Sequence, residues 1–368
     1  MTNRIDLIDE ALKRPGRFEV IIEISLPDEA GRLQILKIHT EKMRKNNILD
    51  SSVDLPLLAE RTKNFSGAEI EGLIKSASSF SLNRHVKVGT IASVSNSVEH
   101  LKVLMQDFDN ALEEVHAAFG RSESEFENCA LYGLIPFNST LKESFHIGTL
   151  MANQLQSLES KSRVLTLLLY GESGTGKTAL ASEIAKNANF PFMKMITPES
   201  VVALSELGKV AYINKVFEDA HRSPLGVVVI DCIEKLMEFV ALGPRFSNLI
   251  YQCLSVLIKK IPPKGRNLLV IITTSNKTLL DEMDLTNACD KEIHVPPVRT
   301  TEELSIILHE LGVFTRSEIE KITYSLASNN FNLNIGVKKL INLVEMSGQE
   351  LAEDRVDVFT ELLLSAHL

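Results

Sequence analysis

The sequence has 368 residues, 44% of them hydrophobic and 24% charged, which is an ordinary balance for a globular protein of about two to three domains. Its net charge of −9 supplies no basic surface, so we expect no nucleic-acid partner. The longest apolar stretches, such as 225–230 and 249–258, fall short of the roughly 18 residues of a membrane-spanning helix, so we expect no transmembrane segment. The start of the sequence lacks the basic and apolar regions of a signal peptide, and the cysteines form no metal-ligand spacing. A cytosolic protein with free thiols is therefore expected.

The first third of the sequence predicts one strand followed by helices. Residues 17–26 have the pattern of a strand, and helical patterns follow it. Ser66 and Glu69 fit a capping box, in which each side chain satisfies a free backbone N–H of the other residue. Since one strand makes no sheet, this region is interpreted as the end of a domain whose beginning lies elsewhere. A linker is expected over 119–139, where Ser/Glu-rich residues replace the apolar periodicity.

From residue 140 onward, strand and helix patterns alternate. The expected strands are 164–170, 190–196, 225–231, 267–274 and 291–295. The expected helices between them include 177–188, 208–221 and 246–259. This alternation predicts an α/β fold of three layers, in which helices cover both faces of a parallel sheet. After residue 297 the pattern is wholly helical, with capping-box candidates at Thr300–Glu303 and Thr315–Glu318, which indicates a small helical lid over 298–368.

A glycine-rich octapeptide follows the predicted strand 164–170. It reads Gly171-Glu172-Ser173-Gly174-Thr175-Gly176-Lys177-Thr178 and opens a predicted helix, which is the context of a phosphate-binding P-loop. In such a loop, backbone N–H groups hold phosphate oxygens, Lys177 reaches the β and γ phosphates, and Thr178 ligates Mg²⁺. The expected nucleotide contacts are Ser173, Gly174, Thr175, Gly176, Lys177, Thr178, Ala179 and Leu180. The alternative, a Gly/Ser-rich turn with a coincidental lysine, leaves the flanking strand and helix unexplained.

The predicted strand 225–231 ends in a carboxylate, Asp231, at the distance beyond the P-loop where a Walker B aspartate holds Mg²⁺. Capping of the next helix is the alternative role for this residue. ATPases of this class place a second carboxylate at the following position as the base for the attacking water, and here that residue is Cys232. A neutral thiol is a poor base. Glu234 is expected to face another direction, so we predict slow hydrolysis or none.

With these residues in place, the sequence resembles the AAA+ ATPases, and among them the N-ethylmaleimide-sensitive fusion factors, the family of vesicle-fusing ATPases. The resemblance covers nearly the whole chain. The stretches that carry it are Arg14-Pro15-Gly16-Arg17, Leu26-Pro27-Asp28-Glu29-Ala30-Gly31-Arg32, Asn64-Phe65-Ser66-Gly67-Ala68-Glu69 and Leu242-Gly243-Pro244-Arg245-Phe246-Ser247-Asn248.

The resemblance implies that 1–118 is the C-terminal part of a first AAA+ domain, without its own P-loop or Walker B strand. Asn3 would then stand at the sensor-1 position, and Arg14 and Arg17 would be arginine fingers that act on a neighbouring subunit's nucleotide. The alternative for both arginines is a solvated pair at the entry of a strand.

The resemblance also implies a complete second AAA+ domain, with its P-loop subdomain over 140–297 and its lid over 298–368. Lys338 matches the lid lysine that approaches the γ-phosphate, with a surface lysine on an amphipathic helix as the alternative. Ser275 or Asn276 occupies the sensor-1 position, and no arginine follows Cys289 where a finger is expected. Backbone near the adenine would come from Gly133, Leu134, Ile135, Pro136, Phe137 and Asn138.

The function implied by the resemblance is that of an ATP- and Mg²⁺-binding subunit of the hexameric machine that disassembles SNARE complexes with the adaptor protein SNAP. The implied location is the cytoplasm, at transport vesicles and the Golgi, as a homo-oligomer or in mixed rings with full-length protein. A catalytically silent, nucleotide-dependent assembly module is the second hypothesis, and Cys232 separates the two. A GTPase is the weakest hypothesis, because Asn276-Lys277-Thr278-Leu279 lacks the aspartate of a guanine-reading motif.

Overall fold

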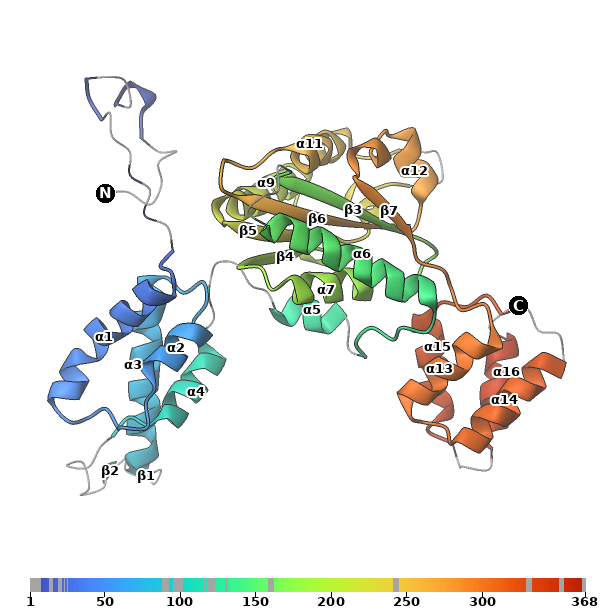
Figure 1. Cartoon of the computed structure of the whole chain (residues 1–368), viewed down its shortest axis with the longest axis horizontal. Helices are drawn as coiled ribbons and strands as arrows, with labels where there is room; N and C mark the ends of the chain where they lie inside the picture. Colours follow the sequence, from blue (N-terminus) through green and yellow to red (C-terminus); the bar gives the residue numbers. More distant parts are fainter. Residues whose placement is uncertain are drawn as a thin grey trace. The chain divides into compact units, whose positions relative to one another are not determined.

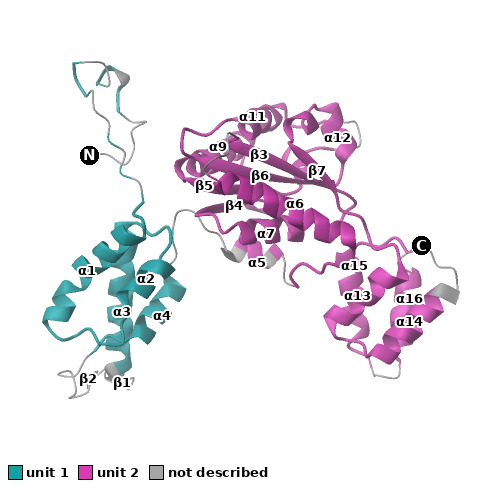
Figure 2. Ribbon diagram, viewed as in Figure 1, with its two compact units in different colours: residues 1–118 teal, residues 119–368 magenta. Residues whose placement is uncertain are grey.

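The computed structural model describes residues 8–12, 16–18, 22, 24, 26–87, 93–94, 102–115, 117, 123–129, 132–157, 162–240, 245–328, 333–350 and 354–365. The chain divides into two compact units, residues 1–118 and 119–368 (Figure 2). The units have separate hydrophobic cores. None of the helices in the described ranges has both the length and the apolar character needed to cross a membrane.

The first unit is mainly helical. Its elements are η2 (Glu10–Leu12), α1 (Glu29–Lys45), α2 (Leu55–Arg61), α3 (Gly67–His85), β1 (Val86–Lys87), β2 (Ser93–Val94) and α4 (Met105–Glu114) (Figure 1). The predicted capping box at the start of α3 is confirmed, since the Ser66 N–H donates to Glu69 Oε2 at 2.6 Å and the Glu69 N–H donates to Ser66 Oγ at 3.4 Å. Leu36, Leu73 and Phe108 are fully buried, so α1, α3 and α4 share one core.

The strand predicted over 17–26 is absent from the described part of that range. Arg17, Phe18, Ile22, Ile24 and Leu26 lie outside any strand. Ile22 and Ile24 are 80% and 85% exposed, so their apolar side chains lie mainly in solvent. The pattern of a strand is insufficient by itself, because a strand is stable only when neighbouring strands accept and donate its hydrogen bonds.

The second unit is built on a parallel sheet. Its strands are β3 (Val164–Tyr170), β4 (Phe192–Ile196), β5 (Leu225–Ile230), β6 (Asn267–Thr274) and β7 (Lys291–His294). They lie in the order β4-β5-β6-β3-β7, and every neighbouring pair is parallel. The predicted α/β fold is therefore confirmed. Because all strands run the same way, the loops after β3, β5 and β6 meet at one edge of the sheet.

Helices cover both faces of this sheet, as predicted (Figure 1). Leu167 and Leu169 of β3 pack in one core cluster and Leu168 in the other, because successive side chains of a strand point to opposite faces. On the sheet, the helices of the first cluster are α5 (Glu123–Cys129), α6 (Ser139–Gln156) and α7 (Lys177–Ala188), and this cluster continues into the C-terminal helices. The helices of the second cluster are α9 (Glu206–Arg222), α10 (Ile233–Leu236), α11 (Asn248–Lys259) and α12 (Lys277–Glu282). The short elements α8 (Pro198–Val201) and η4 (Thr286–Ala288) complete the connections.

The segment expected as a linker, 119–139, is partly structured. It contains α5, whose Phe126 is fully buried in the first core cluster. Ile135 and Phe137 are buried in the same cluster. The prediction of a linker followed the Ser/Glu-rich composition of the segment and gave no weight to these few apolar residues. Because they are buried, the segment packs on the second unit.

The C-terminal part of the second unit is the predicted helical lid. It consists of α13 (Thr301–Leu311), α14 (Arg316–Ser328), α15 (Val337–Ser347) and α16 (Arg355–Ser365). The capping box at its first helix is confirmed, since the Thr300 N–H donates to Glu303 Oε2 and the Glu303 N–H donates to Thr300 Oγ1, both at 3.2 Å. The Phe314 and Phe359 rings lie 5.3 Å apart between their centroids and join the helices in one core.

Candidate functional site

The glycine-rich loop joins the end of β3 to the start of α7, in the predicted order of strand, loop and helix. Gly176, the residue before α7, has a φ of 96°, a left-handed conformation that glycine adopts without steric cost. The backbone N–H groups at a helix start have no partner within the helix, and the helix dipole favours negative charge there. The loop therefore has the backbone geometry of a phosphate-binding site.

The residues predicted to contact the nucleotide differ in exposure. Ser173 is exposed, Gly174, Gly176, Thr178 and Ala179 are half-buried, and Thr175, Lys177 and Leu180 are buried. Thr175 donates its hydroxyl hydrogen to the Glu172 carbonyl at 3.0 Å, which stabilises the turn of the loop. Leu180 packs in the hydrophobic core. These two side chains therefore support the loop itself.

Lys177 bends back over the loop. Its Nζ donates to the carbonyl oxygens of Gly171 at 2.9 Å and Glu172 at 2.6 Å. Burial lowers the pKa of Lys177, while the nearby Cys232 and the carboxylate of Glu234 act to raise it. The ammonium is thus held at the mouth of the loop by neutral acceptors, and a phosphate would replace them with charged oxygens, which make stronger hydrogen bonds.

Asp231 lies at the carboxyl end of β5, directly beside the P-loop threonine. Its Oδ1 accepts hydrogen bonds from Thr178 Oγ1 at 2.6 Å and from Thr273 Oγ1 at 2.8 Å. The Thr273 hydroxyl in turn accepts from the Cys232 N–H at 2.9 Å. A hydroxyl and a carboxylate in contact are oxygen donors of the kind that Mg²⁺ prefers, so Thr178 and Asp231 fit a magnesium ion.

Cys232 has a backbone conformation that is uncommon for residues other than glycine. Its φ is 50° and its ψ 58°, in the left-handed region, and it precedes the first residue of α10. Burial raises the pKa of the Cys232 thiol to about 12, and the carboxylates of Asp231 and Glu234 add to the shift. The thiol is therefore neutral at physiological pH, as the sequence predicted, and it is a poor proton acceptor.

Glu234, which was expected to face another direction than Cys232, places its carboxylate at the end of β6. Its carboxylate accepts hydrogen bonds from Thr274 Oγ1 at 2.9 Å, Ser275 Oγ at 2.6 Å and the Ser275 N–H at 3.1 Å. The left-handed turn at Cys232 starts α10 at once, and α10 packs against β6. The direction of Glu234 thus depends on a backbone conformation that its sequence position does not reveal.

The structure separates the two candidates for the sensor-1 position. Asn276 caps α12, since its Oδ1 accepts from the Leu279 N–H at 3.2 Å and from Thr278 Oγ1 at 2.7 Å. Ser275 instead directs its hydroxyl to Glu234 at the end of β6. Of the two residues, Ser275 is therefore the one whose hydroxyl contacts Glu234.

The lid touches the P-loop through its backbone. The Lys338 N–H, in the first turn of α15, donates to the Gly174 carbonyl at 3.0 Å, and the Lys338 side chain is exposed. A Cβ on Gly336 would lie 2.9 Å from the same Gly174 oxygen, so only glycine fits this approach. The predicted lid lysine is thus beside the loop, and Gly336 is a residue that the sequence reading missed.

The predicted adenine segment lies between α5 and α6. Ile135 and Phe137 turn their side chains into the core, Leu134 packs against it, and Gly133 and Pro136 are exposed. Asn138 caps α6 by accepting from the Leu141 N–H at 2.7 Å, and its Nδ2 donates to Glu303 Oε1 of the lid at 3.2 Å. The side chains therefore fix the segment on the second unit, and its contact with adenine stays a prediction.

The predicted arginine fingers belong to the first unit. Asn3 and Arg14 lie outside the described residues. Arg17 is exposed, and its guanidinium donates to the Ala11 carbonyl at 2.8 Å. Its predicted role at a neighbouring subunit's nucleotide stays a prediction.

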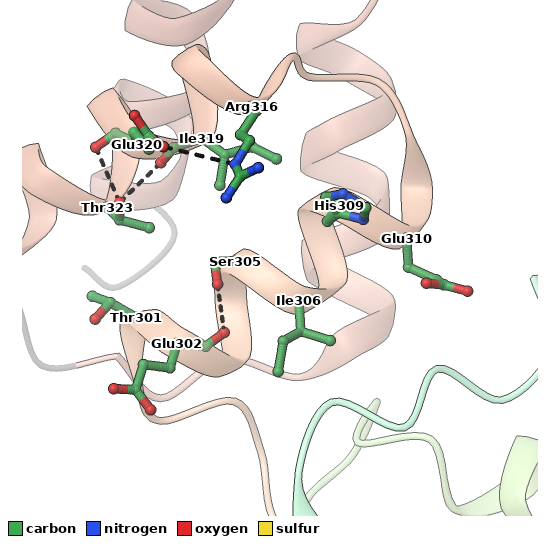
Figure 3. A pocket seen from close by; sticks show the side chains of 10 residues that line it. All are labelled: Thr301, Glu302, Ser305, Ile306, His309, Glu310, Arg316, Ile319, Glu320 and Thr323. Carbon is green, nitrogen blue, oxygen red and sulfur yellow. Dashed lines mark hydrogen bonds and ion pairs between the residues drawn. The ribbon is translucent and has the colours of Figure 1, made fainter.

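A separate groove of about 570 Å³ lies between α13 and α14, on the lid itself (Figure 3). It is lined by Thr301, Glu302, Ser305, Ile306, His309, Glu310, Arg316, Ile319, Glu320 and Thr323. These residues include none of the predicted site residues, so this groove is distinct from the P-loop site.

Three family models match the chain. The model of the ATPase family associated with various cellular activities (AAA) matches residues 167–297, which contain the P-loop and Asp231. A model of the AAA+ lid domain matches residues 52–95 in the first unit. A model of the NSF, AAA+ ATPase lid domain matches residues 298–364, which are the lid of the second unit.

Curated relatives agree with these matches over nearly the whole chain. The Schizosaccharomyces pombe vesicular-fusion protein sec18 is 48% identical over 369 residues, which cover 100% of this chain and 46% of the relative. The vesicle-fusing ATPases of Arabidopsis thaliana and Dictyostelium discoideum are 44% and 45% identical over 95% of this chain, and the matches cover 46% of each relative. The chain thus spans about half the length of these relatives. It belongs to the vesicle-fusing ATPases, a family of nucleotide-binding AAA+ proteins.

Proposed function

We propose that this chain binds ATP together with Mg²⁺ at the loop 171–178. The observation that carries the proposal is the 2.6 Å hydrogen bond from the Thr178 hydroxyl to Asp231, because it joins the loop to the end of β5. These two oxygen ligands would hold the ion. A bound Mg²⁺ would neutralise charge on the phosphate oxygens during phosphoryl transfer.

The other site residues have complementary roles in this proposal. Lys177 exchanges its bonds to the Gly171 and Glu172 carbonyls for the β and γ phosphates. Lys338, next to Gly174, approaches the γ-phosphate from the lid. The backbone of 133–138 contacts the adenine, and Arg14 and Arg17 act on the nucleotide of a neighbouring subunit.

In the cell, the chain acts as a subunit of a hexameric machine that disassembles SNARE complexes with SNAP, in vesicle-mediated transport. The names of its relatives, which describe vesicle fusion, support this role. The partners are further copies of the chain or full-length protein in a mixed ring. The location is the cytoplasm, at transport vesicles and the Golgi.

Within this assembly, residues 1–118 act as the C-terminal part of a first AAA+ domain. Residues 140–297 form the P-loop subdomain of a second AAA+ domain, and residues 298–368 form its lid. The family matches over 52–95, 167–297 and 298–364 support this division.

A second candidate function is a nucleotide-dependent assembly module that hydrolyses little or no ATP. Cys232 favours it, because its neutral thiol occupies the position of the usual base. Removal of a positioned base typically costs about 10²- to 10⁴-fold in rate. Both candidates need the same ATP site, so nucleotide binding is the first property to measure.

The test is the substitution Lys177→Ala, measured by calorimetric titration with ATP and Mg²⁺. We expect the affinity to fall at least about tenfold, since the variant loses charge-assisted hydrogen bonds to phosphate. Lys142→Ala, which removes an exposed lysine from α6, is the matched control and retains the parent affinity. Equal affinity in the parent and in Lys177→Ala would refute the site.

A further inference from the structure

The carboxylate of Glu234 has no role in the proposed binding of ATP and Mg²⁺. Asp231 is occupied, because its Oδ1 accepts from two threonine hydroxyls. The next residue, Cys232, offers a thiol in place of a carboxylate. Glu234 is the remaining acidic group of this turn, it is only 7% exposed, and its charge acts on Lys177. A buried carboxylate is costly unless hydrogen bonds compensate it, so its surroundings indicate its purpose.

Within the part of the chain that the structure describes, the hydrogen bonds to this carboxylate come from the end of β6. Oε2 accepts from Thr274 Oγ1 at 2.9 Å, and Oε1 accepts from both the N–H and the hydroxyl of Ser275. Thr274 is fully buried and serves the packing of the strand end. Ser275, in contrast, is an exposed residue directly after the end of β6.

The bond to Glu234 fixes the polarity of the Ser275 hydroxyl. A serine hydroxyl has one hydrogen to donate and two lone pairs that accept. Ser275 gives its hydrogen to Glu234 over 2.6 Å, so its oxygen can offer only lone pairs to a neighbouring molecule. A water molecule beside Ser275 must therefore donate to it, which directs the lone pairs of that water away from Ser275.

We propose that Ser275, positioned by Glu234, takes the place of the missing base at Cys232 in ATP hydrolysis. This rests on the proposed binding of ATP at the loop 171–178. The water oxygen bonds to the γ-phosphorus, and the bond from this phosphorus to the bridging oxygen breaks, with its electron pair leaving on ADP. The water proton passes to Ser275 Oγ as the Ser275 proton passes to Glu234, which later releases it to solvent. Ser275 is the catalytic residue, and Glu234 is its positioning residue.

The experiment compares Glu234→Gln and Ser275→Ala with the parent chain, with and without the further substitution Cys232→Glu. The kcat and KM of ATP hydrolysis, the ATP affinity by calorimetry and the melting temperature without nucleotide are measured for each. In the Cys232 background we expect kcat to fall at least about tenfold, with KM and affinity within about twofold. In the Cys232→Glu background we expect kcat to fall less than about threefold, because the restored acid takes over the proton. Thr278→Ala, two residues beyond Asn276 in the same turn, is the matched control and keeps the parent kcat.

Three outcomes would overturn the proposal. An unchanged kcat in Glu234→Gln removes the positioning role. An equal loss of kcat in both backgrounds would show that Ser275 and Glu234 have only a structural role. The same conclusion would follow if the loss of kcat came with a lower ATP affinity and a lower melting temperature. If the parent chain binds ATP but shows no hydrolysis above the blank, the proton transfer through Ser275 and Glu234 is excluded. The proposed nucleotide site is not contradicted by this result. Loss of ATP binding in the parent would instead contradict the proposed function itself.

Discussion

His221 is a buried histidine at the end of α9, where its ring packs edge-on against Phe217. Burial is the main reason that its pKa is lowered, and the positive charges of Lys260 and Arg266 add to the effect. The unfolded chain, in which this imidazole is solvated, therefore binds the proton more readily than the folded chain. The stabilising contribution is complete above the ordinary pKa of histidine and is lost as the pH falls below it.

We therefore predict that His221→Gln weakens the acid sensitivity of folding. Between about pH 7.5 and pH 5.5, the free energy of unfolding should fall less in this variant than in the parent, because glutamine takes up no proton. Denaturant unfolding at a series of pH values measures the difference. Identical slopes in the parent and His221→Gln would contradict the assignment.

The residues of the P-loop were predictable, whereas their supporting network was not. Lys177, Thr178 and Asp231 follow from a motif whose spacing reflects its chemistry, and the structure brings Thr178 and Asp231 into contact. The sequence gives no sign that Thr273 supports the site, because it is one of several residues in a largely apolar strand. Its contact with Asp231 follows only from the pairing of β5 with β6. The orientation of Glu234 required the φ of 50° at Cys232, a conformation that sequence patterns do not predict for cysteine.

At the scale of elements, long uninterrupted hydrophobic patterns predicted the first and last residues of helices and strands accurately. The strands 164–170 and 267–274 and the helix 177–188 coincide with β3, β6 and α7. Each is periodic or largely apolar and is followed by a glycine or a polar residue, so local sequence and tertiary packing agree. The expected strand 17–26 lacks this agreement, because its stability depends on neighbouring strands that its own pattern cannot supply.

The start of α15 offers a test of the contact between lid and loop. Gly336→Ala would place a Cβ 2.9 Å from the Gly174 oxygen and 3.1 Å from the Ser173 oxygen, and both are backbone atoms that cannot turn aside. Its φ of −72° suits alanine, so the effect is steric alone. We predict a loss of ATP affinity of about fivefold or more, in line with overpacking costs of about 1 to 3 kcal/mol.

The matched control for this substitution is Gly72→Ala within α3. A Cβ there meets no atom within 4 Å, and alanine stabilises a helix interior by about 0.5 to 1 kcal/mol relative to glycine. Titration with ATP and thermal unfolding are measured on both variants. If Gly336→Ala binds ATP as tightly as Gly72→Ala does, the lid contact has no part in the nucleotide site.

At the scale of the whole molecule, the predicted nucleotide site lies within residues 119–368, apart from the proposed arginines. Hydrogen bonds join its α/β part to the lid. The Lys338 N–H donates to the Gly174 carbonyl, and Asn138 Nδ2 donates to Glu303 Oε1. The loop and the lid are therefore in contact, and a nucleotide held between them would fix their relative angle.

We predict that ATP drives the association of this chain into larger rings. A ligand that binds one conformation stabilises it by mass action, and an interface formed by both sheet and lid becomes continuous only when their angle is fixed. Multi-angle light scattering should report a higher molar mass with ATP and Mg²⁺ than without them. Lys142→Ala should assemble like the parent, and Lys177→Ala should stay at the lower mass because it cannot hold the phosphates that couple loop to lid. The same mass for the parent with and without nucleotide would contradict an assembly role, and assembly of Lys177→Ala equal to that of the parent would show that association is independent of the P-loop.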